Sequence, residues 1–124
     1  MVMKHLGTHF MVELYGCDSK TIGDVDAIEK IMIAAATKSK ARIIDKKFHT
    51  FSPHGVSGTV IIAESHLVIH TWPEHGYCAV DIFTCGDAID NAAALKVLEK
   101  SLGSKHSSAM EIKRGLLKES DNKM

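Results

Sequence analysis

Residues able to act as nucleophiles, acids or bases crowd into one stretch of this 124-residue chain, from Phe51 to Gly86. The stretch reads FSPHGVSGTVIIAESHLVIHTWPEHGYCAVDIFTCG and contains hydroxyls, imidazoles, carboxylates and thiols. An imidazole titrates near neutrality, and a thiol with a pKa of about 8.5 can give up a proton at neutral pH. The stretch is therefore the first place to look for a functional site.

Taken singly, these residues also have ordinary structural explanations. Ser57 fits a strand hydroxyl in a glycine-flanked bend, His70 a structural histidine, and Cys85 a small buried hydrophobe. The dipeptide Glu-Ser occurs twice, at 64–65 and at 119–120, so it specifies nothing alone.

A metal site is a second interpretation, because five candidate ligands lie close together in sequence: His66, His70, His75, Cys78 and Cys85. On a strand, residues four apart are separated by roughly 13 Å, which is too far for two ligands of one zinc ion. The spacing therefore does not favour a metal, and we expect none.

The composition indicates one domain, residues 1–124, with no nucleic-acid or membrane partner. Fifteen basic residues balance fifteen acidic ones, so no broad positive field attracts phosphates. No apolar run approaches the ~20 residues that span a bilayer, and the amino terminus lacks the apolar segment of a secretory signal. Three cysteines without CxxC spacing predict no disulfide framework and at least one free thiol. We expect a cytoplasmic protein.

The elements that position the stretch follow from apolar periodicity. Alternation around 9–15 predicts a first strand, and apolar residues at steps of three and four predict a helix from an N-cap at Asp18 or Ser19 to near Ser39. Further strands are predicted at 42–51, 56–63, 66–72 and 77–84, with turns supplied by proline and glycine between them.

A second helix is predicted after Asp90 or Asn91, with Gly103 ending it, and a final strand near 108–115. This order predicts an α/β fold of the α+β type: a two-layer sandwich with a mainly antiparallel sheet and two helices on one face. The other face of the sheet would then need to be covered by a second chain, which favours a dimer.

Considered as a unit, the stretch resembles the pyruvoyl-dependent S-adenosylmethionine decarboxylases of bacteria and archaea, in which the motifs GVSG, ESH, HTWPE and FTCG occur in this order and at this spacing. The resemblance extends more loosely to LGTHFMVELYGCD and the helix after it. It implies a decarboxylase that makes the aminopropyl donor for spermidine biosynthesis.

The resemblance implies that the precursor cuts itself between Glu64 and Ser65. The Ser65 hydroxyl attacks the Glu64 carbonyl, the amide becomes an ester, and β-elimination releases residues 1–64 from residues 65–124. Position 65 is left as a pyruvoyl group, the covalent cofactor, which binds the substrate amine as a Schiff base and withdraws electrons from it.

Two further residues are implied in processing, Ser57 as the hydroxyl partner and His70 as the base for elimination. Along an uninterrupted strand, Ser65 and His70 point to opposite faces. We therefore expect the turn at 64–65 to break the alternation.

For catalysis, the resemblance implies that Cys85 donates the proton that replaces carbon dioxide. It also implies substrate contacts from Phe51, Leu67, Trp72 and Glu74, with the two aromatic rings stacking on adenine and Glu74 binding the ribose hydroxyls. The expected assembly is a homodimer of cleaved subunits.

Two alternatives stay open at this point. A relative of the same fold and cofactor could decarboxylate arginine or ornithine instead. A non-catalytic homologue could dimerise with an active subunit, although the presence of Ser65, His70 and Cys85 argues against this.

Overall fold

The computed structural model describes residues 3–63, 65–85 and 88–118. Within these residues the chain forms six strands, three α-helices and one short 3-10 helix. In chain order they are β1 (Met3–Tyr15), α1 (Ser19–Ile22), α2 (Val25–Lys38), β2 (Ile43–Thr50), β3 (Val56–Ile62), β4 (Ser65–Trp72), η1 (Pro73–His75), β5 (Tyr77–Thr84), α3 (Asn91–Leu102) and β6 (His106–Lys118).

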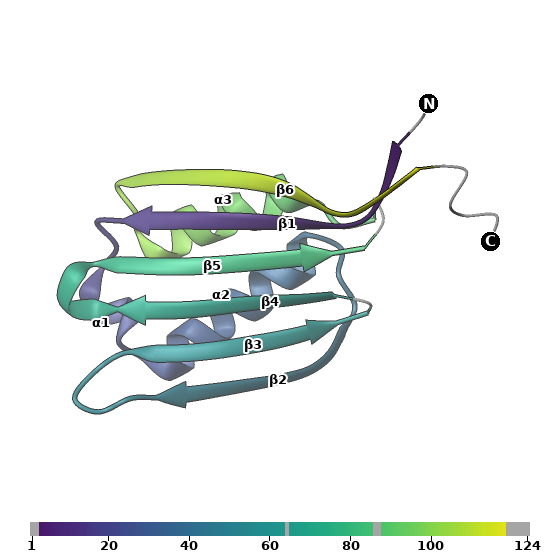
Figure 1. Ribbon diagram of the computed structural model, residues 1–124. Helices are drawn as coiled ribbons and strands as arrows, with labels where there is room; N and C mark the ends of the chain where they lie inside the picture. Colours follow the sequence, from purple (N-terminus) through teal and green to yellow (C-terminus); the bar gives the residue numbers. More distant parts are fainter. Residues whose placement is uncertain (1–2, 64, 86–87, 119–124) are drawn as a thin grey trace.

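All six strands pair antiparallel in one sheet with the order β2-β3-β4-β5-β1-β6. The first and last strands of the chain therefore lie side by side. Figure 1 shows α2 and α3 together behind the sheet, on one of its faces. The predicted two-layer sandwich is confirmed.

Successive side chains along each strand point to opposite sides of the sheet. The helices cover one side, and we call the other side the open face. On β4, Ile69 and Thr71 are buried toward the helices, whereas His70 and Trp72 are exposed on the open face. The buried residues of the sheet and helices form one hydrophobic core. One layer of helices thus stabilises the sheet, and no described element covers its other face.

The long first helix predicted from Asp18 is instead two helices, α1 and α2. Gly23 ends α1, and the Asp24 carboxylate accepts hydrogen bonds from the backbone amides of Asp26 and Ala27, at 3.0 and 3.3 Å. A residue that caps the N-terminus of a helix is not itself in helical conformation. The predicted helix is therefore interrupted at Asp24, although the apolar residues continue at steps of three and four. The end of α2 lies where the periodicity predicted it.

The second predicted helix and the remaining strands are confirmed. Asp90 caps α3 by accepting a hydrogen bond from the Ala93 amide at 3.0 Å, and Gly103 ends the helix with a φ of 68°. That backbone conformation suits glycine because no Cβ is present to clash. β6 is longer than predicted because it pairs with β1 along that strand's length.

None of the helices among the described residues is long and apolar enough to cross a membrane.

Candidate active site

Ser57 and His70 form a hydrogen-bonded pair on the open face. They lie directly opposite each other on β3 and β4, and the Ser57 Oγ is 2.7 Å from the His70 Nδ1. A hydroxyl in contact with an imidazole can exchange a proton with it. The structure therefore brings together the two residues to which the sequence assigned auxiliary processing roles.

Ser65 and Cys85 meet at the other end of the same strand. Ser65 is the first residue of β4, and its Oγ accepts a hydrogen bond from the backbone amide of Cys85 at 3.0 Å. Both residues are half-buried. Next to them on the open face, His66 stacks on Phe83 with 5.7 Å between ring centroids. Glu64, the other predicted cleavage residue, lies outside the described residues.

The expected break in alternation between Ser65 and His70 does not occur. β4 runs without interruption through both residues, and its register with β3 is continuous from Ile62 to Ser57. β4 already begins at Ser65, so the alternation of faces is kept from Ser65 to His70. Five steps along a strand correspond to roughly 16 Å, so one chain holds these two side chains apart.

Three of the four predicted substrate residues, Phe51, Trp72 and Glu74, lie at the Ser57 end of the sheet. Phe51 follows β2 with 48% of its surface exposed, and Trp72 ends β4 with 39% exposed. The Trp72 ring lies 6.4 Å from the His70 ring, which links it to the Ser57 pair. We call Phe51, Ser57, His70, Trp72 and Glu74 the Ser57 cluster, and Ser65, His66, Phe83 and Cys85 the Ser65 cluster.

Glu74 lies on η1 and pairs with a histidine that the sequence left without a role. Its Oε1 is 3.2 Å from the Nε2 of His54. A hydrogen bond from its own backbone amide, followed by the attraction of His54 and His75, lowers the pKa of the Glu74 carboxyl below its ordinary value. Glu74 is therefore an anionic acceptor at neutral pH.

The Leu67 side chain lies apart from the other predicted substrate residues. Its side chain is fully buried on the helix side of β4, in the core. The alternation that exposes His70 and Trp72 buries Leu67, because it lies an odd number of positions from each of them. A substrate contact from Leu67 stays a prediction, and it would involve the backbone rather than the side chain.

Thr71 is a structural residue of the site that sequence reasoning missed. Its buried hydroxyl accepts a hydrogen bond from the Val56 amide at 2.9 Å and donates one to the Ile22 carbonyl at 2.8 Å. It thereby joins β4 to β3 and α1, next to His70 and Trp72. The sequence did contain one indication of this role. Thr71 occupies a buried position of an otherwise apolar strand, where a hydroxyl needs a hydrogen-bond partner.

Cys17 and Cys78 are buried and form a thiol pair. The hydrogen bond to Cys17 and burial both raise the pKa of Cys78, so it remains a neutral thiol. Cys85 is the most solvent-accessible of the three cysteines. Among the described residues, no three His, Cys, Asp or Glu side chains are arranged to hold a metal ion.

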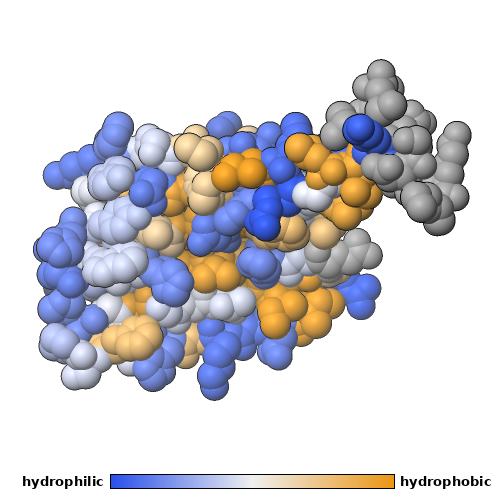
Figure 2. Space-filling view, viewed as in Figure 1, coloured by the Kyte–Doolittle hydropathy of each residue, from blue (hydrophilic) through white to orange (hydrophobic). Residues whose placement is uncertain are grey.

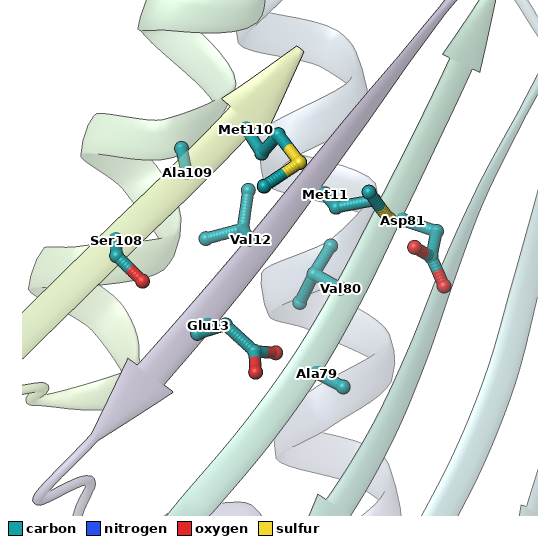
Figure 3. Close-up of a pocket in the computed structure, with 9 residues that line it drawn as sticks. All are labelled: Met11, Val12, Glu13, Ala79, Val80, Asp81, Ser108, Ala109 and Met110. Carbon is teal, nitrogen blue, oxygen red and sulfur yellow. The ribbon is translucent and has the colours of Figure 1, made fainter. Parts of the chain in front are cut away.

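The open face carries apolar side chains mixed with polar ones, as Figure 2 shows. Tyr15, Ile61, Met110 and Ile112 are exposed there, Met110 to 59%. Between β5, β1 and β6 this face is hollowed into a pocket of about 380 Å³ (Figure 3), whose lining includes Met11, Glu13, Ala79, Asp81, Ser108 and Met110. Of the predicted site residues that the structure describes, none lines this pocket. It is a recess in an uncovered sheet rather than the candidate active site.

Comparison with known proteins defines first the fold and then the family. The structure aligns with the crystal structure of the adenosylmethionine decarboxylase from Aquifex aeolicus with a TM-score of 0.86 and 35% identity, over 94% of this chain and 96% of the other. The family model described as S-adenosylmethionine decarboxylase matches residues 8–115. The chain belongs to the S-adenosylmethionine decarboxylase family.

Two relatives show how far the similarity extends. Both are named S-adenosylmethionine decarboxylase proenzyme. The protein from Pelotomaculum thermopropionicum is 50% identical over 94% of this chain and 93% of its own length. The protein from Carboxydothermus hydrogenoformans is 51% identical over 94% of this chain and 92% of its own length.

Proposed function

We propose that this chain is the precursor of a self-processing, pyruvoyl-dependent enzyme that decarboxylates S-adenosylmethionine, and that its product is the aminopropyl donor for spermidine synthesis. The single observation that carries the proposal is the hydrogen bond from the Cys85 amide to the Ser65 hydroxyl, within a chain of this family. It sets the predicted nucleophile beside the predicted proton donor.

In the proposed self-cleavage, the Ser65 Oγ attacks the Glu64 carbonyl carbon and the peptide C–N bond breaks, which gives an ester and a free amine. A base then removes the α-proton of residue 65, the Cβ–Oγ bond breaks, and residues 1–64 leave as a carboxylate. Hydrolysis of the remaining dehydroalanine releases ammonia and leaves a pyruvoyl group on residues 65–124. The Cys85 amide assists because it holds the hydroxyl oxygen in place for attack.

Position 65 suits such a group. A pyruvoyl carbonyl supplies the electron sink that carbon dioxide loss requires. Ser65 is half-buried at the end of the sheet, so one side of this position lies against the protein and the other is open to substrate. The hydrogen bond from its backbone amide holds Cys85 beside this position, and we propose that the Cys85 thiol returns a proton to the substrate carbon.

We infer that a second copy of the chain completes each site. The Ser65 and Ser57 clusters lie at opposite ends of β4, roughly 16 Å apart, so His70 cannot reach position 65 of its own chain. The exposed apolar side chains of the open face, including Met110 and Ile112, suit the packing of a second sheet at ~10 Å. A two-fold axis through the stacked sheets would bring the Ser65 cluster of one copy opposite the Ser57 cluster of the other.

The Ser57 cluster favours a nucleoside substrate. The exposed rings of Phe51 and Trp72 can stack on adenine and attract a sulfonium, and the Glu74 carboxylate can accept hydrogen bonds from two ribose hydroxyls. Arginine and ornithine have neither a flat base nor a vicinal diol. The three free cysteines suit a reducing compartment, so we place the enzyme in the cytoplasm.

Intact-mass analysis and a substrate comparison test the proposal together. We expect two fragments, residues 1–64 and 65–124, the second blocked by a carbonyl that hydrazine reagents trap. The Glu-Ser dipeptide at 119–120 serves as an internal control and should stay uncut. Carbon dioxide release should occur from S-adenosylmethionine and not from arginine or ornithine. A single full-length chain, or a second fragment that begins with unmodified serine, would contradict the proposal.

A further inference from the structure

His54 lies where the turn between β2 and β3 meets the carboxylate proposed to bind ribose. Its Nε2 is 3.2 Å from the Glu74 Oε1. No step of the proposed reaction uses this histidine. The contact joins two segments that are distant in sequence and that each carry an aromatic ring of the Ser57 cluster, Phe51 and Trp72.

The backbone on the His54 side of this contact is well anchored. The Phe51 amide donates to the Gly55 carbonyl at 2.8 Å and closes the turn, and the Val56 amide donates to the Thr71 Oγ1 at 2.9 Å. Gly55 has a φ of 111°, and a Cβ there would lie 3.2 Å from the Thr71 carbonyl oxygen. The turn therefore packs directly against β4.

The backbone on the Glu74 side is anchored as well. The Ser19 hydroxyl donates to the Pro73 carbonyl at 2.9 Å, and the Cys17 amide donates to the Gly76 carbonyl at 2.8 Å. Both partners thus extend from ordered backbone, while their side chains remain 45% and 39% exposed. A ligand can therefore reach the Glu74 carboxylate without displacing His54.

We propose that His54 is a positioning residue that fixes the orientation of the Glu74 carboxylate for the ribose hydroxyls of S-adenosylmethionine, an inference that rests on the proposed function. A carboxylate only accepts hydrogen bonds, so the His54 Nε2–H is the donor. Two carboxylate oxygens offer about four acceptor directions, so one bond to His54 leaves capacity for two hydroxyls. Holding the carboxylate in one orientation reduces the ordering required when substrate binds.

Substitution of His54 tests the proposal through the Michaelis constant. His54→Leu removes the donor and should raise KM for S-adenosylmethionine roughly threefold to tenfold, the loss expected for one hydrogen bond of ordinary net strength between two half-exposed side chains. Self-cleavage and kcat should stay within about twofold of wild type, because the base and nucleophile are untouched. His54→Gln keeps a donor and should keep KM near wild type. His75→Leu is the matched control, because His75 lies beside Glu74 but is not paired with it.

A double-mutant cycle decides whether His54 acts through Glu74. His54→Leu should have little further effect on KM in a Glu74→Gln background. Additive effects of the two substitutions, or an unchanged KM in His54→Leu, would overturn the inference while leaving the proposed function standing. A wild-type enzyme that releases no carbon dioxide from S-adenosylmethionine would overturn both.

Discussion

Ser65 and His70 lie on one uninterrupted strand, five positions apart, and face opposite sides of the sheet. Ser65 pairs with the buried Ile62, whereas His70 pairs with Ser57 on the open face. The two side chains of one chain are also roughly 16 Å apart along the strand, so if both act in one self-cleavage event, the imidazole must come from another chain.

Co-expression of two inactive variants tests this arrangement. A mixed dimer of Ser65→Ala and His70→Ala holds one site with both native residues, the serine from one chain and the histidine from the other. We expect each variant alone to stay uncut and the mixture to yield residues 1–64, measured by intact mass. Variants that dimerise but never complement would place the whole site within one chain.

His70→Ala should stop processing at the ester. Without its base, elimination should slow roughly 100-fold to 10,000-fold, while attack by the Ser65 hydroxyl still proceeds. Hydroxylamine cleaves esters much faster than amides, so it should cut the His70→Ala chain between residues 64 and 65. Ser65→Ala cannot form the ester and should resist the reagent. Equal resistance of the two variants would remove His70 from the elimination step.

Thr71→Val should destabilise the fold without touching the reacting groups. Valine has nearly the same shape but leaves the buried Val56 amide and the Ile22 carbonyl without their partner. The expected loss is about 1–3 kcal/mol in the free energy of unfolding, measured by urea in an uncleaved Ser65→Ala background. Thr59→Val, on the open face of β3, should change it by about 0.5 kcal/mol or less.

Tyr77 should make stability fall at alkaline pH. Burial, followed by its hydrogen bond to the Glu13 Oε1 at 2.5 Å, raises the pKa of Tyr77 far above its ordinary value. Above a pH of about 10 the unfolded chain loses this proton and the folded chain keeps it, so rising pH favours unfolding.

Urea midpoints at pH 8 and pH 10.5 measure this effect. Tyr77→Phe should flatten the decline between the two pH values, whereas Tyr15→Phe, the ring that stacks on Tyr77, should not. Identical slopes in wild type and Tyr77→Phe would show that another group is responsible.

The sequence alone was enough for most elements and for the residue types of the site. Periods of two and 3.6 residues are local properties, so β5, α3 and the two-layer class followed from them. The motif order indicated the chemistry of Ser65, His70 and Cys85. The alternation of β4 also indicated that the Leu67 side chain faces the core.

The tertiary structure alone decided which of those residues meet. Strand register pairs Ser57 with His70 and separates both from Ser65, and contacts between distant segments place His54 against Glu74 and the Thr71 hydroxyl between β3 and α1. Such contacts depend on how strands pair and helices pack. Side-chain periodicity records which face a residue occupies, but it carries no information about which distant residue lies beside it.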